Sequence, residues 1–421
     1  MVPDAEPFLQ RIRAFPDEDA HRLIFADWLE EQGLRESDRA AFIRIQVALA
    51  GMNPDNARRT ALLAAERELL DVYRAEWEEP IRGLATGPEF RRGFVEEVKV
   101  AARQFLRHAD AIFAAGPIRH VHLLDLGQSL DRVMQSPFLG RLTALTVFAQ
   151  HAGEPLARAV ARCSQLAGLH GLYLGRNRLE DDAALHFAAS PFLTNLVELD
   201  LAENDLSESG ARALAASPHL AGLRRLELRH NPIGPGGAEA LAGSERLASL
   251  ERLGLGDTSL GLPRLHALPR ISDLLRIPIL DLAGNRLGPA SLKTILTRPL
   301  HLAGETGPAR LRELDLNHNE IGEAGARVLA ECKSLEGLQT LHLAGCGLTD
   351  AAARLIANAT NLNRLTTLDL ANNPIVDSGF RAFLESTQLR SLRRLFVPLG
   401  ISPGMKAALD QRFQRGTLRN A

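Results

Sequence analysis

One spacing constrains this chain more than any other feature: the pattern L-x-x-L-x-L-x-x-N-x-L recurs at steps of 27 residues. Its starts, in chain order, are Leu169, Leu196, Leu223, Leu250, Ile277, Leu311, Leu338, Leu365 and Leu392. The step is 27 everywhere except between Ile277 and Leu311, where it is 34. A period that keeps its register over so many units predicts stacked repeats, each burying its apolar face against its neighbours.

The residues of one repeat, 196–222, predict a strand, a turn and a helix in that order. Apolar and polar side chains alternate over residues 198–202, which is typical of a strand that buries its leucines. Asn204 follows at the turn, and the alanine-rich segment 209–216 favours a helix. The same pattern predicts parallel strands of one curved sheet at residues 171–175, 198–202, 225–229, 313–317, 340–344 and 367–371.

This repeat resembles the leucine-rich repeat family, in the ribonuclease-inhibitor-like branch that has a helix in each repeat. The resemblance implies an α/β solenoid, with a curved parallel sheet on its concave side and helices on its convex side. We expect about twelve units over residues 87–398, the first three of them divergent, since terminal repeats cap the stack. A capping helix that opens at Ser402 is expected within residues 399–421.

In this family the side chain at the Asn position is buried, hydrogen-bonds the loop backbone and links neighbouring coils. The resemblance therefore implies a structural ladder at Asn177, Asn204, Asn231, Asn285, Asn319, Cys346 and Asn373. Thr258 occupies this position in one repeat, and we expect its contribution to the ladder to be weaker than that of an asparagine. Cysteine alternates with asparagine here in this branch, so Cys346 is expected to be a structural thiol.

Two irregular segments interrupt the repeats. Residues 262–270 contain two prolines, which disfavour a regular helix. Seven extra residues fall in the following unit, most simply in the loop 302–308. Long loops often carry function. An insertion on a tolerant convex side also costs little free energy, and we favour this second interpretation.

Residues 1–86 do not repeat and predict a small all-α domain. Helices are expected from a cap at Asp17 through Glu31, from a cap at Ser37 through Leu49, and from Asn53 through about residue 78. Two segments, R-L-I-F-A-D-W-L-E-E at 22–31 and D-R-A-A-F-I-R-I-Q at 38–46, resemble the short companion domain that precedes leucine-rich or propeller repeats in large bacterial protein sets. The segment F-R-R-G-F at 90–94 is also similar to these proteins.

The companion-domain resemblance implies no biochemical activity. Among its polar residues, Asp27, Arg39 and Arg44 suggest two alternatives. They form a binding site, or they form ion pairs within the domain and a solvated helix face. We favour the structural interpretation, because surface charge on helices is the ordinary case.

Composition excludes several classes of protein. The net charge of −2 argues against a dedicated nucleic-acid binder, which is usually strongly basic. Three cysteines cannot make a disulfide framework. No signal-peptide core and no apolar run long enough for a membrane span are visible. We therefore expect a cytoplasmic monomer without nucleic-acid or membrane partners.

Motifs for catalysis or cofactor binding are missing from the sequence. There is no H-E-x-x-H, no phosphate-binding loop and no paired C-x-x-C. His120 and His122 should share one face of a strand, but a metal would need further ligands from adjacent coils, and Thr146, Tyr173 and Asp200 do not complete a convincing set. We predict surface histidines here, and no metal, cofactor or catalytic residue.

The concave face remains as the candidate recognition surface. Its candidate protein-binding residues are Tyr173, Asp200, Arg225, Glu227, Arg229, Asp281, Asp315, His342, Asp369 and Phe396. Acidic residues dominate the central outward position of the strands, although L-D-L is also the common motif of this repeat class. The sequence thus predicts a non-enzymatic protein-binding module that recognises a protein or peptide. The alternative is a regulator of a nucleotide-driven switch, since the Ran GTPase-activating proteins share this repeat branch.

Overall fold

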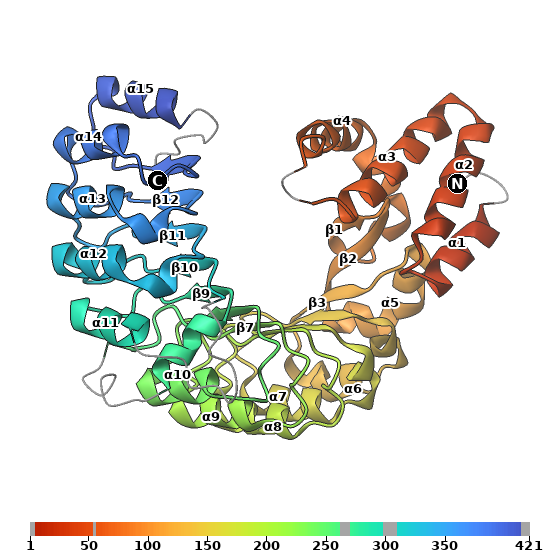
Figure 1. The fold of residues 1–421 in the computed structure, drawn as a ribbon. Helices are drawn as coiled ribbons and strands as arrows, with labels where there is room; N and C mark the ends of the chain where they lie inside the picture. The colour runs from red at the N-terminus through yellow and green to blue at the C-terminus, as the bar shows by residue number, and fades with distance from the viewer. Residues whose placement is uncertain (1–4, 54–55, 262–269, 298–309, 414–421) are drawn as a thin grey trace. The chain divides into compact units, whose positions relative to one another are not determined.

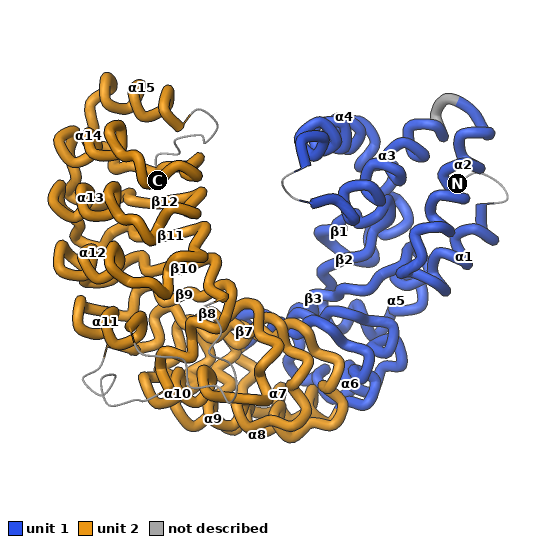
Figure 2. The backbone as a smooth tube through the Cα atoms, in the orientation of Figure 1, with its two compact units in different colours: residues 1–150, 163–173 blue, residues 151–162, 174–421 orange. Residues whose placement is uncertain are grey.

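The computed structural model describes residues 5–53, 56–261, 270–297 and 310–413 of the chain. The chain divides into two compact units (Figure 2). Unit 1 comprises residues 1–150 and 163–173, and unit 2 comprises residues 151–162 and 174–421. The predicted loop 302–308 and almost all of the double-proline segment lie outside the described residues.

Unit 1 begins with four helices, of which the sequence predicts the last three, whereas the first was not predicted. They are α1 (Glu6–Ala14), α2 (Asp19–Gln32), α3 (Leu34–Ala50) and α4 (Arg59–Trp77), followed by a 3₁₀ turn (Glu79–Ile81). The cap predicted at Ser37 is wrong: α3 begins at Leu34, and the Ser37 hydroxyl donates to the Gly33 carbonyl oxygen at 2.9 Å. Gly33, at φ 131°, makes the break between α2 and α3 in a single residue, so no separate capping segment is needed.

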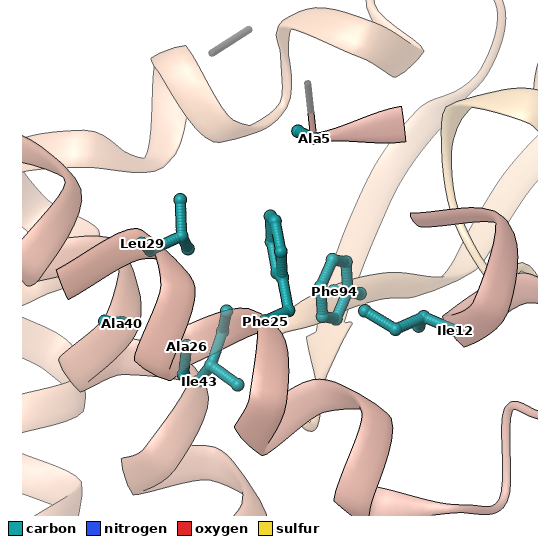
Figure 3. Close-up of a cluster of buried hydrophobic side chains, with 8 residues drawn as sticks. All are labelled: Ala5, Ile12, Phe25, Ala26, Leu29, Ala40, Ile43 and Phe94. Atoms are coloured by element: carbon teal, nitrogen blue, oxygen red, sulfur yellow. The ribbon is translucent and has the colours of Figure 1, made fainter. Parts of the chain in front are cut away.

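These helices pack around an apolar core that includes one residue of the sheet (Figure 3). The core residues are Ala5, Ile12, Phe25, Ala26, Leu29, Ala40, Ile43 and Phe94. Phe94 lies on the second strand, and its ring centroid is 6.0 Å from that of Phe25 on α2. The helical segment and the first strands therefore share a buried core.

The sheet of unit 1 starts with a hairpin that the sequence did not reveal. Strand β1 (Thr86–Arg91) runs antiparallel to β2 (Phe94–Ala101), and Arg92 and Gly93, both at positive φ, form the turn. Strands β3 (His120–Leu124), β4 (Ala144–Thr146) and β5 (Gly171–Tyr173) then follow in parallel. The connecting elements are α5 (Ala102–Ala115), α6 (Leu130–Met134) and 3₁₀ turns at Gly127–Ser129, Pro137–Arg141 and Ser164–Gly168.

Unit 2 is built from the regular repeats. Its strands are β6 (Glu198–Asp200), β7 (Arg225–Glu227), β8 (Arg252–Gly254), β9 (Ile279–Asp281), β10 (Glu313–Asp315), β11 (Thr340–His342), β12 (Thr367–Asp369) and β13 (Arg394–Phe396). Its helices are α7 (Gly153–Arg162), α8 (Glu180–Ala189), α9 (Glu208–Ala216), α10 (Gly234–Ala242), α11 (Pro289–Thr297), α12 (Gly322–Glu331), α13 (Asp350–Ala357), α14 (Asp377–Glu385) and α15 (Pro403–Arg412). Shorter 3₁₀ turns lie at Ile271–Arg276, Lys333–Leu335 and Thr360–Leu362.

The strands of unit 2 pair in parallel, each with its neighbour one repeat away, and helices such as α12 and α13 lie on the opposite side from β10 and β11 (Figure 1). Leu199 lies beside Leu226, and both are buried. The predicted α/β solenoid of parallel strands and outer helices is confirmed. The strands span three residues rather than five, because the chain leaves the ladder for a turn in which Glu203 and Asp205 both have positive φ.

The Asn position links consecutive coils through hydrogen bonds to the backbone. The Asn204 side chain donates to the carbonyl oxygen of Leu174 at 2.9 Å, and its Oδ1 accepts the amide of Asn177 at 2.8 Å. Asn231, Asn285, Asn319 and Asn373 make equivalent contacts to the preceding coil. Cys346 only donates, from its thiol to the carbonyl oxygen of Leu316 at 3.1 Å. Each of these buried amides satisfies backbone groups that no strand partner reaches.

We expect Asn204→Ala to lower the free energy of unfolding by about 1–3 kcal/mol, because the buried amide of Asn177 loses its acceptor. Thr258→Ala should cost clearly less. The Thr258 hydroxyl donates to the Leu255 carbonyl oxygen at 2.7 Å, and that oxygen keeps a second donor, Asn285 Nδ2, at 2.6 Å. Urea unfolding of both variants measures the difference, and equal losses would contradict this account.

A second ladder runs along the helix ends and was not predicted. Ser190, Ser217 and Ser244, spaced by 27 residues, donate to the carbonyl oxygens of Ala161, Ala188 and Ala215 in the preceding repeat. Cys163 and Cys332 make the same kind of contact, with the carbonyl oxygens of Met134 and Leu296. The repeats are thus joined by side-chain hydrogen bonds at two positions.

Candidate functional site

The outward side chains of unit 2 form a column of carboxylates on neighbouring strands. We call Asp200, Glu227, Asp281, Asp315 and Asp369 the acidic column. They lie at equivalent positions of β6, β7, β9, β10 and β12, and Gly254 on β8 and His342 on β11 fill the intervening positions. Adjacent strands are about 5 Å apart, so neighbouring carboxylates influence one another.

Each acid of the column also holds the turn that follows its own strand. One carboxylate oxygen accepts a hydrogen bond from the backbone N–H two residues later: Asp200 accepts from Ala202 at 2.9 Å, and Asp315 accepts from Asn317 at 2.8 Å. Glu227, Asp281 and Asp369 do the same. These side chains therefore stabilise the turns as well as facing the outer surface, because a replacement without an acceptor would leave the turn amide without its side-chain partner.

Burial raises the pKa of Asp200, Glu227 and Asp315 above the ordinary carboxyl range. The cause is the loss of water around half-buried groups, reinforced by neighbouring acids, such as Asp200 and Asp281 beside Glu227. Glu227 lies over Gly254, where a Cβ would fall 2.1 Å from its carboxylate oxygen. The column is thus a partly desolvated negative strip that a cation would stabilise.

The candidate arginines do not form a separate basic cluster. Arg225 pairs with Glu198 at 3.0 Å, and Arg229 pairs with Glu227 at 3.3 Å. At the other end, Asp369 lies 3.8 Å from His342 Nδ1 and raises the pKa of that imidazole. Phe396 lies beside Asp369 in register, on β13. Nine of the ten candidate binding residues therefore share the strand face of unit 2.

Tyr173 is the exception, because it belongs to β5 of unit 1. Its hydroxyl lies over Gly171, and its ring centroid is 5.7 Å from that of His120. The structure therefore places Tyr173 in the surroundings of the two histidines that the sequence singled out.

Those histidines have a third partner that sequence reasoning missed. Glu97 on β2 lies beside His120 in the parallel register, 23 residues earlier in the chain. Its Oε1 is 2.6 Å from His122 Nε2, and its Oε2 is 3.3 Å from His120 Nδ1. The residues that the sequence suggested as further ligands, Thr146, Tyr173 and Asp200, lie in later coils, whereas Glu97 lies in the coil before. The signal was present in the sequence, since the divergent repeats step by 23 residues at this point.

The polar residues of the companion-like segment are engaged within unit 1. Arg44 pairs with Asp27 and Glu30, each at 2.7 Å. Arg39 donates to the Gly93 carbonyl oxygen at 2.5 Å and lies over the ring of Trp77 at 4.5 Å. These contacts support intradomain roles for the three residues.

The segment 38–46 of α3 packs against the hairpin turn at Arg92 and Gly93. Besides the contact from Arg39, the side-chain oxygen of Gln46 accepts the Gly93 amide at 2.7 Å. Ile43 fills the space where a Gly93 side chain would stand. The R-A-x-F-I-R-x-Q segment thus contacts the R-R-G-F turn, two motifs that the sequence showed as separate.

The cysteines show no features of nucleophiles. All three are free thiols and are buried. Burial raises the pKa of the Cys163 thiol, and it raises that of Cys346 to about 11. Reactive cysteines have lowered pKa values and are accessible.

Among the described helices, none is both long enough and apolar enough to cross a membrane.

Sequence comparison agrees with this geometry. A family model described as "Leucine Rich repeat" matches residues 192–215, 222–242, 310–330, 338–357 and 362–384, all within unit 2. The chain carries leucine-rich repeats. No curated protein matches the sequence significantly.

Solved structures show a similar fold at low sequence identity. A structure of the yeast Rad7 and Elc1 complex matches with a TM-score of 0.51 and 16% identity, over 90% of this chain and 91% of that chain. An internalin (InlF) of Listeria monocytogenes aligns with a TM-score of 0.34 and 18% identity, over 70% of this chain and 95% of that chain. The first match supports the solenoid fold, and the second is too weak to add to it.

Proposed function

We propose that this protein is a non-enzymatic binding scaffold whose strand face in unit 2 recognises a basic segment of a partner protein. The observation that carries the proposal is the acidic column. Three of its members, Asp200, Asp281 and Asp315, have no cationic partner within salt-bridge distance among the described residues. A lysine or arginine side chain from a partner would supply the missing counter-charge and steer the encounter.

The surroundings of the column support this role. Ala202, Ala283, Ala344 and Ala371 follow the central residues by two positions, and such small side chains do not project beyond the carboxylates. Leucine-rich repeats provide a regular surface of this kind, but the fold alone does not determine which ligand it binds. Three buried, free thiols suit the reducing cytoplasm, which we propose as the compartment.

An array of immobilised peptides of graded charge, probed with the full chain, tests this function. We expect basic peptides to bind and acidic ones to fail, with binding weakened by salt. The variant Asp200→Asn, Glu227→Gln, Asp281→Asn, Asp315→Asn removes four charges and keeps an acceptor for each turn amide. It should weaken binding at least about tenfold, equivalent to about 1.4 kcal/mol.

A matched control removes four acidic charges from the helix side. Asp182→Asn, Glu208→Gln, Glu331→Gln and Glu385→Gln change the net charge equally, and binding should be retained. Equal weakening in both variants would show a general charge effect and contradict recognition by the strand face. Stimulated GTP hydrolysis by a partner GTPase would instead support the regulator of a nucleotide switch.

A further inference from the structure

Unit 1 contains a second cluster of side chains, separate from the acidic column. Glu97, His120 and His122 project from β2 and β3, and each offers one ligand atom. These three atoms all lie within 4.8 Å of one another. The side chains are 13%, 17% and 22% exposed, respectively, so the cluster is sheltered but reachable from solvent.

The backbone explains why the three residues converge. His120 and His122 are two residues apart on one strand, and side chains at that spacing share a face. Glu97 is the register partner of His120 on the adjacent parallel strand. The cluster therefore rests on strands rather than on a loop, which keeps its ligand atoms close without ordering a flexible segment.

We propose that Glu97, His120 and His122 bind a divalent transition metal ion of the zinc class. Two imidazoles and one carboxylate are a ligand set that zinc accepts, with a fourth position left for water or a partner's group. His122 Nε2, His120 Nδ1 and a Glu97 oxygen are the ligand atoms. Tetrahedral bonds of about 2.0–2.1 Å place ligand atoms roughly 3.3 Å apart. Glu97 Oε1 is 2.6 Å from His122 Nε2, and one ligand atom from each of the three residues lies within 4.8 Å of the other two, so side-chain adjustment alone can meet that geometry.

The surrounding side chains support and orient the ligands. The other ring nitrogen of His120, Nε2, is 2.8 Å from the Thr146 hydroxyl on β4, the kind of outer contact that sets the orientation of a metal-binding imidazole. Arg91 donates to Glu97 Oε2 at 2.7 Å, which leaves Oε1 for the metal. The ring centroid of Tyr173 is 5.7 Å from that of His120. Lys99 is the register partner of His122 on β2.

Titration of the metal-stripped full chain with zinc chloride, followed by calorimetry, tests the site. We expect one zinc ion per chain to bind stoichiometrically at about 10 µM protein and pH 7.5. Cobalt(II) should give the intense visible absorption of a four-coordinate site. Magnesium and calcium, which prefer oxygen ligands, should not compete.

Variants locate the binding and control for folding. Glu97→Gln, His120→Ala and His122→Ala should each weaken zinc binding by at least about 100-fold. His186→Ala is the matched control, because His186 pairs with Glu154 at 2.8 Å in unit 2 but the pair belongs to no three-ligand cluster among the described residues. Its zinc affinity should equal that of the parent chain. Thermal melts in chelator confirm that each variant is folded.

Two results would overturn the proposal. One is a parent chain that fails to bind zinc at these concentrations. The other is a folded Glu97→Gln or His122→Ala variant that binds zinc as tightly as the parent, which would place the ion elsewhere.

Discussion

Gly93→Ala is expected to destabilise unit 1 by about 3 kcal/mol or more, although it adds a single methyl group. Gly93 has φ 89°, a conformation that strains any residue with a side chain. A Cβ there would fall 2.5 Å from Ile43 Cγ1 and 2.8 Å from the Ile43 Cα. The Cα of Ile43 belongs to the backbone of α3, so rotation of the Ile43 side chain cannot relieve that contact.

Gly83→Ala is the matched control for the backbone strain alone. Gly83 also has positive φ, at 76°, but no heavy atom lies within 4 Å of the position of its Cβ. Chemical unfolding followed by tryptophan fluorescence reports both variants, since Trp28 and Trp77 lie in the helices of this unit. If both variants lost similar amounts of unfolding free energy, the packing of α3 against the hairpin turn would contribute little to the stability of unit 1.

Removal of residues 402–421 is expected to abolish cooperative unfolding of the C-terminal repeats, at a cost of at least about 3 kcal/mol. Helix α15 opens at Ser402, whose hydroxyl oxygen accepts the Met405 amide at 3.2 Å and which also hydrogen-bonds Asp377 of α14. Leu409 is fully buried, and Phe413 is 7% exposed. Because α15 packs against α14, its removal exposes the apolar face of the last repeat.

A truncation after Phe413 shortens the chain but keeps α15, and it serves as the control. It should retain the melting temperature of the full chain, whereas the longer truncation should aggregate or melt broadly in calorimetry. A soluble longer truncation with an unchanged sharp transition would show that the final repeat needs no cap.

The repeats of unit 2 were predictable because their information is local and periodic. The predicted strands start at the observed residues, for example Glu198, Arg225 and Glu313. The serine ladder was equally visible in principle, since Ser190, Ser217 and Ser244 keep the same 27-residue step. It was missed because a serine before a proline or a loop is also an ordinary helix terminator.

The division into residues 1–86, 87–398 and 399–421 remains a prediction, as do the resemblance of the N-terminal helices to the companion domain and the ribonuclease-inhibitor-like assignment. Periodicity does not extend to the segment before β2, so sequence reasoning there rested on caps and motifs. It placed the start of α3 wrongly at Ser37 and left the hairpin of β1 and β2 unrecognised.

In the regular repeats of unit 2, the sequence by itself determined where the strands begin, which leucines are buried and where the Asn ladder stands, because a fixed repeat length places equivalent residues in register. Only the tertiary structure decided how separate segments meet. It brought Arg39, Ile43 and Gln46 onto the Gly93 turn, and it placed Glu97 beside His120 and His122. These contacts join residues 23 to 54 positions apart where the period is broken. The contacts at the Gly93 turn depend on how the helices and the first strands pack, which no local pattern encodes.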